Sequence, residues 1–389
     1  LNPPVSVPTP ESGPLNFGIL GAATIAPIAI VTPAKNHEET IIYAVAARDK
    51  AKATAFAKKY DIEKAYGGPN GYQELIDDPE IDAIYNPLPN GLHYEWTMKA
   101  LAAGKHVLLE KPSADTAEET RQMFDFAEKK GLVLLEAFHY RFHPAIQRVK
   151  AIIDSKELGA IKHISASLAI PKGMGPKTSD IRYNFTLGGG SLMDMGCYTL
   201  NVIRYLSSSN PTSVISAEHS IFTPVNSPAS FKPNIDRGTT AMLALPKNAT
   251  ASLKCDLAMP LKYGFIPPMP LVNATITLEG GEIEIYNFVM PTLYHSIKVT
   301  TKDANKKIKT TVEKVYTFAD GKMEGKGEAW WTTYRFQLEA FVDRIKGRTP
   351  QTWVDKDDSI ANMHWIEQIY AKTGLGSRPK SEYVLPHSE

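Results

Sequence analysis

The stretch from Phe17 to Pro27, FGILGAATIAP, joins a short apolar run to a helical pattern through a glycine. Gly21, Ala23 and Ala26 fit the pattern G-x-G/A-x-x-G/A. In that pattern the first glycine permits a sharp turn, a small second residue lets a pyrophosphate approach the backbone, and a small third residue lets the helix pack on the strand. Any tight strand-to-helix turn also selects small residues, so the surrounding sequence has to decide whether this loop holds a dinucleotide.

The sequence around the loop alternates between two patterns from residue 16 to about residue 138. Segments with apolar residues at helical spacing separate the short apolar runs NFGIL, TIIYAVAA, DAIYN, HVLLE and LVLLEAF. This alternation is typical of a parallel sheet with helices on both faces. It predicts an α/β fold whose first domain, residues 16–140, is a Rossmann doubly wound sheet with the glycine loop at its first strand-to-helix turn.

The pattern changes after residue 140. Eight β-rich segments follow, and they are IKHISASLAI, TSVISAEHSIF, GTTAMLALP, ATASLKCDLAM, NATITLEG, EIEIYNF, HSIKVTT and IKTTVEKVYTF. Strands that follow strands predict an α+β domain over residues 141–389, with a large, mostly antiparallel sheet and helices against one face. Residues 1–15 are rich in proline and serine, and we expect a disordered leader there.

The composition excludes several classes of partner. The 389 residues are 43% hydrophobic and 22% charged, with a formal net charge of +1 and no basic run, so neither a nucleic acid nor an anionic membrane is expected as a partner. No stretch is long and apolar enough to span a bilayer. Two cysteines are too few for a disulfide framework, so we expect a cytoplasmic protein.

The end of the second apolar run bears on the choice of cofactor. An NAD site usually has a carboxylate there for the ribose 2′-hydroxyl, whereas an arginine suits the 2′-phosphate of NADP. This chain has Ala47 in the acidic position and Arg48 next to it, which favours NADP. Asp49 is the competing observation, and residues 48–52 could also be no more than the solvated start of a helix.

Two further motifs carry side chains capable of chemistry. Lys111 lies in EKPSA at the carboxyl end of an apolar run, where open α/β sheets bind ligands, although it could be a solvated lysine before a proline turn. Asp194 and Tyr198 lie four residues apart in LGGGSLMDMGCYTLN and would share one face of a helix. The alternative is a core tyrosine whose hydroxyl is capped by Asp194.

Together, GILGAATIA, YNPLPNGLHYEW, LLEKPSA, EAFHYRFHP and GGGSLMDMGCYTLN resemble the glucose–fructose oxidoreductase, inositol dehydrogenase and rhizopine catabolism protein family, over residues 16–383. Many members have a histidine where this chain has Tyr198. In this respect the chain resembles the branch that contains glucose–fructose oxidoreductase, dimeric dihydrodiol dehydrogenase and the fungal NADP-dependent D-xylose dehydrogenases. This resemblance implies NADP-dependent oxidation of the anomeric hydroxyl of an aldopentose, D-xylose to D-xylono-1,5-lactone. The alternatives are a trans-dihydrodiol dehydrogenase and a non-catalytic dinucleotide-sensing regulator, and a regulator would have no reason to keep the whole catalytic set.

The resemblance also assigns site residues. It makes Lys111, Asp194 and Tyr198 the catalytic set, with either Tyr198 or Lys111 as the base. A tyrosine with an ordinary pKa near 10 needs a nearby cation to act at neutral pH. The substrate-binding residues would be Arg182, Asp194, Tyr198 and Trp331. Trp331 is included because one of the two adjacent tryptophans, Trp330 and Trp331, could form an aromatic platform for a sugar ring. The cofactor-binding residues would be Gly21, Ala22, Ala23, Thr24, Ile25, Arg48, Asn86, Pro87, Leu88, His93, Glu110 and Lys111.

Three expectations complete the sequence-based picture. We expect no metal, because Pro144 indicates a helix start that need not place His139 and His143 on one face. We expect Cys197 to be a buried small residue. We also expect a homodimer through the open face of the C-terminal sheet, since an uncovered apolar sheet face is costly in water.

Overall fold

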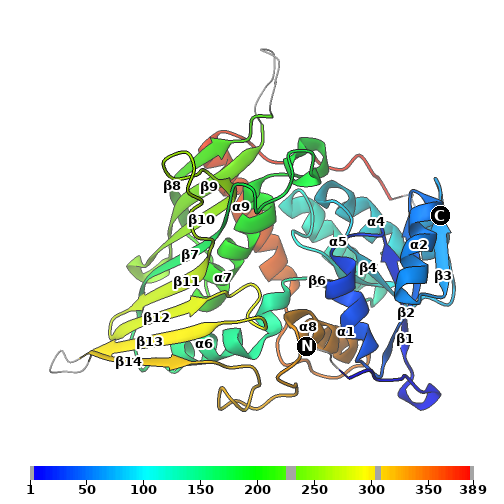
Figure 1. The fold of residues 1–389 in the computed structure, drawn as a ribbon, viewed down its shortest axis with the longest axis horizontal. Coiled ribbons are helices and arrows are strands. Elements are labelled where there is room, and N and C mark those ends of the chain that lie inside the picture. Colours follow the sequence, from blue (N-terminus) through cyan, green and yellow to red (C-terminus); the bar gives the residue numbers. More distant parts are fainter. Residues whose placement is uncertain (1–3, 225–233, 303–307, 386–389) are drawn as a thin grey trace.

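The first domain is built on a parallel sheet, which is drawn in blue and cyan in Figure 1. The structure is a computed structural model, and it describes residues 4–224, 234–302 and 308–385. Its six strands have the order β3-β2-β1-β4-β5-β6, the order of a doubly wound dinucleotide-binding sheet. The strands are β1 (Leu15–Leu20), β2 (Thr40–Ala47), β3 (Lys64–Gly67), β4 (Ala83–Asn86), β5 (His106–Leu109) and β6 (Leu134–Glu136). The predicted Rossmann fold is confirmed.

Both faces of this sheet are packed, because its strands are apolar on both sides. In β1, Ile19 belongs to the core that continues into the second domain, whereas Leu20 belongs to a separate core on the opposite face. Strand β3 was not predicted, since its sequence KAYG is only half-buried at the sheet edge and forms no apolar run. The helical segments are η2 (Pro27–Val31), α1 (Thr32–Lys35), α2 (Lys50–Tyr60), α3 (Gly71–Ile76), α4 (His93–Ala102) and α5 (Ala117–Lys130).

The second domain contains an eight-stranded sheet with the order β14-β13-β12-β11-β7-β10-β9-β8. Among the described strands, β7 and β10 form its one parallel pair, and the other neighbours are antiparallel, as predicted. The strands are β7 (Ile161–Pro171), β8 (Ser213–Ile221), β9 (Asp236–Ala244), β10 (Thr250–Met259), β11 (Leu271–Leu278), β12 (Gly281–Tyr286), β13 (Ser296–Lys302) and β14 (Ile308–Glu313).

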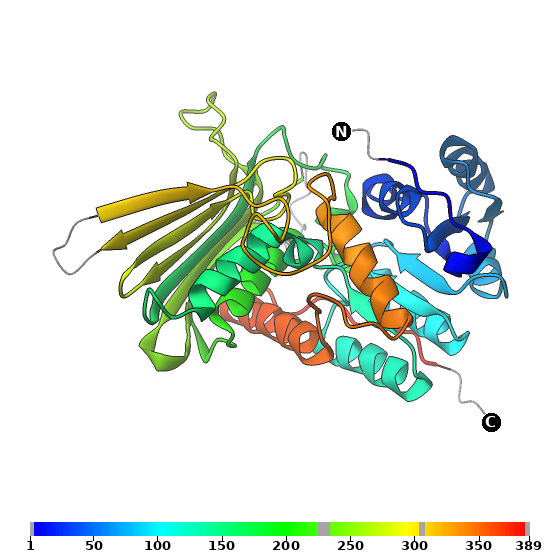
Figure 2. The same ribbon diagram turned by 90° about the horizontal axis from the view of Figure 1, so that it is seen from below.

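Helices α6 (Pro144–Asp154), α7 (Cys197–Ser207) and α9 (Lys356–Thr373) lie on one side of this sheet (Figure 2). Along β7 the buried Ile164 and Ala166 alternate with the half-buried Ser165 and Ser167. The face that carries these serines also bears a hollow of about 350 Å³ lined by Thr240, Ser252 and Lys254 among others. The open face is therefore rich in hydroxyl groups in this region and is not the apolar surface that we expected.

The end of the chain returns to the first domain. Helix α8 (Thr333–Ile345) packs on η2 and α1, and the rings of Phe17 and Phe341 lie 6.1 Å apart between centroids. Farther along, the Ser381 amide donates to Glu119 Oε1 at 2.7 Å. Residues from α8 onward thus contact both sheets. The predicted domain boundary at residue 140 therefore marks only the first point at which the chain passes from one domain to the other.

The segment expected to be a disordered leader contacts the body of the protein over part of its length. The Ser6 amide donates to the Lys35 carbonyl at 3.0 Å, and Ser12 Oγ donates to the Glu38 carbonyl at 2.7 Å. Residues 1–3 of that expectation lie outside the described residues. Within the described part of the chain, no helix combines the length and the apolar character needed to cross a membrane.

Candidate active site

A cleft of about 670 Å³ opens at the carboxyl edge of the parallel sheet, where it faces the second domain. It brings together fourteen predicted site residues, and these are Gly21, Ala22, Ala23, Thr24, Ile25, Arg48, Pro87, Leu88, His93, Glu110, Lys111, Arg182, Asp194 and Tyr198. Asn86 and Trp331 are not among the lining residues. The cleft also contains Lys52, Tyr72, Asp180 and Tyr334, which the sequence reasoning missed.

The glycine loop fits a dinucleotide at one end of this cleft. Gly21 has φ +97°, which L side chains rarely adopt, and its amide donates to the Ala46 carbonyl at 2.8 Å. A Cβ at this position would meet Leu88 Cδ2 at 3.3 Å, so only glycine keeps both the turn and the space above it. The backbone from Gly21 to Thr24 is therefore open to a pyrophosphate.

The end of β2 places positive charge on the same cleft. Arg48 and Lys52 both line it, and Arg48 is exposed. Asp49 lies between them, but its Oδ1 accepts the amides of Ala51 at 2.8 Å and Lys52 at 3.3 Å and so caps α2. One oxygen of the carboxylate that could bind a ribose hydroxyl is thus used to cap its own helix.

Asn86 shapes the cleft from behind. Its side chain is fully buried, Nδ2 donates to Thr97 Oγ1 at 3.1 Å, and Oδ1 accepts the Leu88 amide at 3.3 Å, which holds the turn after β4. His93 Nδ1 and Nε2 lie 2.8 and 2.7 Å from the carbonyls of Pro112 and Leu88. The pKa of His93 is nevertheless lowered to about 4, because the cost of burying the charged imidazolium outweighs its stabilisation by these two carbonyls.

Lys111 and Asp194 form the centre of the site. Lys111 Nζ lies 3.0 Å from Asp194 Oδ1, and Arg182 Nε donates to Asp194 Oδ2 at 2.9 Å. Burial favours the neutral carboxyl, but the Lys111 and Arg182 cations prevail and lower the pKa of Asp194 to about 2. Burial likewise opposes the charge on Lys111, yet the Asp194 carboxylate outweighs it and the pKa of Lys111 is raised.

Tyr198 is the third member of the set, and its hydroxyl does not bind Asp194. Its oxygen lies 3.0 Å from His139 Nε2, while Lys111 Nζ lies over the tyrosine ring, 4.8 Å from the centroid. Burial, together with Tyr334 and Glu110 nearby, raises the pKa of Tyr198 well above its ordinary value. In the protein alone, Lys111 therefore does not bring the pKa of Tyr198 down towards neutrality. Burial also raises the pKa of Cys197 to about 12, which fits a buried, unreactive thiol.

A buried ion pair fixes the helix that carries Asp194. Arg378 Nη2 lies 2.9 Å from Asp236 Oδ1, and both side chains are fully buried. Arg378 Nε donates to the Gly189 carbonyl at 2.6 Å, while Asp236 Oδ2 accepts the Leu192 amide at 2.7 Å. Gly190 has φ +135°, and a Cβ there would lie 2.4 Å from Asp236 Oδ1. The triple glycine thus allows the chain to pass this ion pair before η7 (Leu192–Gly196) begins.

The expectation that Trp331 binds substrate is not supported by its position. The Trp331 side chain is 5% exposed and packs beneath the Arg335 guanidinium, 3.9 Å from the ring centroid. Tyr334, three residues later, reaches the cleft instead. The sequence spacing could not have shown this, because Trp331 lies before α8 begins at Thr333, whereas Tyr334 lies within that helix.

The two histidines considered as a metal pair are both used in other ways. His139 contacts Tyr198 and Thr333, whereas His143 Nδ1 accepts the Ala145 amide at 3.1 Å and caps α6. Over residues 4–224, 234–302 and 308–385, no three His, Cys, Asp or Glu side chains are grouped so that they could hold a metal ion.

Comparison with known proteins agrees with this architecture. The family described as "Oxidoreductase family, NAD-binding Rossmann fold" matches residues 15–138, and the "GFO/IDH/MocA C-terminal domain" matches residues 146–284. The D-xylose 1-dehydrogenase (NADP(+)) 2 of Haloferax volcanii is 33% identical over 369 residues, 93% of this chain and 98% of that protein. The trans-1,2-dihydrobenzene-1,2-diol dehydrogenase of Sus scrofa is 31% identical over 251 residues, 64% of this chain and 69% of that protein.

A solved structure supports the fold independently. The aldose-aldose oxidoreductase from Caulobacter crescentus, complexed with glycerol, superposes with a TM-score of 0.74 at 22% identity and covers 93% of this chain and 98% of its own. At that identity the likeness shows the fold alone. With the two family matches and the Haloferax relative, it establishes that this chain belongs to the glucose–fructose oxidoreductase, inositol dehydrogenase and rhizopine catabolism protein family of oxidoreductases.

Proposed function

We propose that this protein oxidises the anomeric hydroxyl of D-xylose to D-xylono-1,5-lactone, with NADP as the hydride acceptor. The observation that carries this proposal is the contact of Lys111 Nζ with Asp194 Oδ1 at 3.0 Å, beside the ring of Tyr198 in a cleft that also contains the dinucleotide loop. The similarity to a D-xylose 1-dehydrogenase over 93% of the chain supports this choice of substrate.

The residues around the cleft divide the work of oxidation between them. When bound, the oxidised nicotinamide supplies the hydride acceptor. The Tyr198 oxygen takes the proton of the sugar hydroxyl, and the Lys111 ammonium stabilises the negative charge on that oxygen. Asp194 orients Lys111 through the ion pair. Arg182 has its Nη1 on Asp180 and its Nε on Asp194, so its guanidinium is held at the cleft as a donor for sugar hydroxyls.

The choice of NADP rests on the charges at the end of β2. Arg48 and Lys52 offer two cations to a 2′-phosphate, whereas Asp49 is engaged at the N-terminus of α2. A guanidinium binds phosphate in a bidentate manner, which favours the 2′-phosphate of NADP at this position.

A second candidate is oxidation of an aromatic trans-dihydrodiol. Leu168, Ile181 and Met195 line the same cleft and could contact an apolar ring, and a dihydrodiol dehydrogenase is among the relatives. A non-catalytic, dinucleotide-sensing regulator is less favoured, because Lys111 contacts both Asp194 and the ring of Tyr198.

The test is a substrate panel with the purified protein. Pentoses including D-xylose, hexoses and benzene dihydrodiol are each offered with NADP and with NAD, and the absorbance of the reduced nicotinamide is followed. D-xylose with NADP should give the highest kcat/KM, and Tyr198→Phe should abolish most of that rate. If only the dihydrodiol is oxidised, the sugar assignment is wrong. If nothing is oxidised while NADP still binds, the regulator is favoured.

We further propose a homodimer through the open face of the second sheet, in a cytoplasmic setting. The hydroxyl-rich hollow on that face could form hydrogen bonds with a second copy, and Cys197 and Cys255 are free thiols, as is usual in a reducing compartment. Light scattering at micromolar concentration should give twice the mass of one chain, and replacing Ser165 and Ser252 with lysine should reduce it to a single chain. A wild-type protein that is monomeric at that concentration would exclude this dimer.

A further inference from the structure

The hydroxyl of Tyr198 has a buried partner that the sequence motifs do not assign. His139, in η4 (His139–Phe142), places Nε2 3.0 Å from the Tyr198 oxygen and Nδ1 2.8 Å from Thr333 Oγ1 at the start of α8. The Tyr334 ring stacks on the imidazole, with 4.0 Å between centroids and 27° between the planes, and this fixes the plane of the ring. Three elements far apart in the sequence therefore hold one imidazole against the tyrosine.

The imidazole is neutral in this position. The side chain of His139 is 1% exposed, and burial, reinforced by the Lys111 cation, lowers the pKa of His139 to about 3. A neutral imidazole carries one ring hydrogen, so one nitrogen donates and the other accepts. The hydroxyl groups of Tyr198 and Thr333 can each act in either sense, and the two nitrogens can therefore exchange roles without a change of charge.

That freedom ends when Tyr198 ionises, because a phenolate oxygen accepts hydrogen bonds and cannot donate one. If the Nε2 lone pair then faced it, two lone pairs would meet at 3.0 Å. We propose that His139 is a positioning residue that donates its Nε2–H to the Tyr198 oxygen whenever that oxygen is negative, while Thr333 Oγ1 donates to Nδ1 and holds this tautomer. The inference rests on the proposed role of Tyr198 as the base.

The protons balance in this arrangement. The Tyr198 oxygen takes the proton of the substrate hydroxyl as the hydride leaves the sugar carbon, and afterwards it releases that proton to water in the cleft. His139 gains and loses no proton in the cycle. Its hydrogen bond stays in place and becomes charge-assisted when the phenol ionises, which is when such a bond is strongest.

Several other groups face Tyr198 and also act on its ionisation. Lys111 favours the phenolate, whereas the negative or ionisable groups around the ring oppose it, and these are Glu110, Asp194, Cys197, Tyr85 and Tyr334. Each of these groups acts through charge over a distance. Among the described residues, His139 is the hydrogen-bond partner of the Tyr198 hydroxyl, and its contribution can be removed without changing any charge.

The experiment compares two amides in place of the imidazole. His139→Gln carries its amide nitrogen about as far along the side chain as Nε2 and can still donate to Tyr198, whereas the amide of His139→Asn ends near the position of Nδ1 and cannot. Thr333→Val keeps the imidazole and removes the hydroxyl that holds its tautomer. Tyr198 is replaced by 3,5-difluorotyrosine, whose fluorines lower the phenol pKa into an accessible range and report its ionisation by ¹⁹F NMR, without cofactor or substrate.

We expect the pKa of the fluorinated Tyr198 to rise by about one to two units in His139→Asn, because a hydrogen bond to a charged group is lost. His139→Gln should restore most of the wild-type value, and Thr333→Val should shift it in the same direction as His139→Asn by a smaller amount. ¹⁵N NMR of labelled histidine should show the hydrogen of His139 on Nε2 when Tyr198 is ionised. In the profile of kcat against pH, the apparent pKa of the low-pH limb should rise in the same variants and rank them in the same order.

Two results would overturn the inference. A folded His139→Asn protein whose Tyr198 titrates as in the wild type would mean that the imidazole only packs, and a hydrogen on Nδ1 in the ionised state would contradict the tautomer directly. The titration uses no substrate, so failure to oxidise any sugar would refute the proposed function alone. A titration that shifts while the pH profile stays fixed would leave the hydrogen bond in place and remove Tyr198 from the role of base.

Discussion

Lys111 and Asp194 are 83 residues apart in the chain, yet Lys111 Nζ contacts both the carbonyl oxygen of Asp194, at 2.9 Å, and its Oδ1, at 3.0 Å. The double contact joins the segment just after β5, in the first domain, to η7, in the second domain. Because the aspartate holds the ammonium charged, Lys111 is a poor proton acceptor at neutral pH. Of the two candidates for the base, this relationship favours Tyr198.

The first prediction tests whether Lys111 and Tyr198 serve one proton transfer. Lys111→Met and Tyr198→Phe should each lower kcat by about 10²–10⁴-fold, the usual contribution of a general acid–base group. The double variant should be little worse than the poorer single variant, since both changes remove the same step. The affinity for NADP, measured by fluorescence quenching, should change little in Tyr198→Phe. Additive losses would show that the two residues act in separate steps.

The second prediction concerns cofactor choice. Arg48→Ala should raise the KM for NADP by roughly tenfold to a hundredfold, because a charge-assisted contact with phosphate is lost. The KM for NAD should stay nearly constant. Lys58→Ala is the matched control, since this lysine lies on α2 but does not line the cleft. An equal loss with both cofactors would assign Arg48 to the dinucleotide in general and not to the 2′-phosphate.

The fold could be predicted from the sequence because its signals are local. The apolar runs of a parallel sheet that is buried on both faces are continuous, and a glycine with φ +97° after the first run marks the cofactor turn. The edge strand β3 escaped prediction because its residues are only half-buried. The return of α8 and the chain end to the first domain depends on contacts such as Phe17 with Phe341, and no local pattern reveals such contacts.

The candidate site could be predicted only in part, because local motifs reveal some of its residues but not the partners around them. Lys111, Asp194 and Tyr198 lie in motifs, but the partners that decide their charge come from elsewhere in the chain. His139 was considered only as a possible metal ligand, and its contact with Tyr198 spans 59 residues. Trp331 was chosen because two adjacent tryptophans suggest a sugar platform, whereas the structure buries Trp331 under Arg335 and presents Tyr334 to the cleft.

The third prediction concerns Asp115, a buried carboxyl beside Gly188 of the triple glycine. Neither of its oxygens has a hydrogen-bond partner, and burial together with the Glu119 carboxylate raises the pKa of Asp115 to about 8. Between about pH 4 and pH 8 the folded state keeps a proton that the unfolded state releases, so the free energy of unfolding falls as the pH rises. Asp115→Asn removes this linkage without breaking a hydrogen bond.

Urea unfolding at about pH 5 and pH 8 measures the effect. Asp115→Asn should be more stable than the wild type at pH 8 by more than about 1 kcal/mol, and the difference should shrink towards pH 5. Asp61→Asn is the control, because it makes the same chemical change at an exposed carboxylate at the end of α2. If Asp115→Asn loses stability at both pH values, the carboxyl is ionised and bound in the folded protein.

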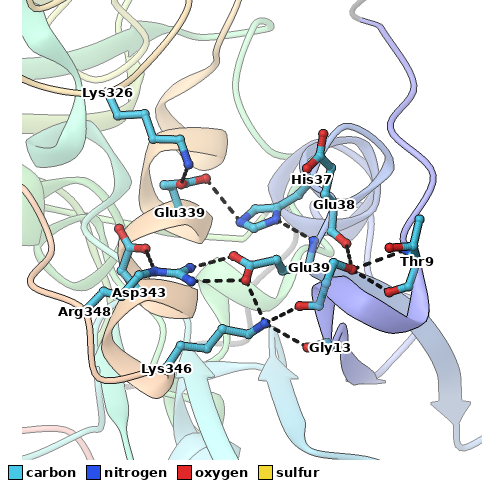
Figure 3. A network of polar contacts seen from close by, with 11 residues as sticks. Thr9, Gly13, His37, Glu38, Glu39, Lys326, Glu339, Asp343, Lys346 and Arg348 are labelled. Carbon is cyan, nitrogen blue, oxygen red and sulfur yellow. Dashed lines mark hydrogen bonds and ion pairs between the residues drawn. The ribbon is translucent and has the colours of Figure 1, made fainter.

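A cluster of charged side chains joins the residue just before β2, in the first domain, to the residues just after α8, in the second (Figure 3). Glu39 is its centre, since Arg348 donates to Oε1 at 3.1 Å and to Oε2 at 2.6 Å, and Lys346 donates to Oε1 at 2.7 Å. Lys346 Nζ also donates to the Gly13 carbonyl at 2.8 Å, which ties down the chain before β1. The Arg348 hydrogen bonds, assisted by Lys346, outweigh partial burial and lower the pKa of Glu39 to about 2.

The last prediction follows from the sign of that shift. A carboxyl whose folded pKa is depressed stabilises the protein above its unfolded pKa, and this stabilisation is lost as the pH falls from about 4.5 to about 2. Glu39→Gln should therefore lower the free energy of unfolding at about pH 7 by roughly 1–2 kcal/mol, a figure reduced because the Glu39 side chain is 21% exposed. The deficit should narrow in urea unfolding at lower pH, as the wild-type carboxyl becomes protonated. Glu38→Gln makes the same chemical change at the neighbouring exposed carboxylate and is the control. An equal loss of stability in both variants would mean that Glu39 acts only through net charge.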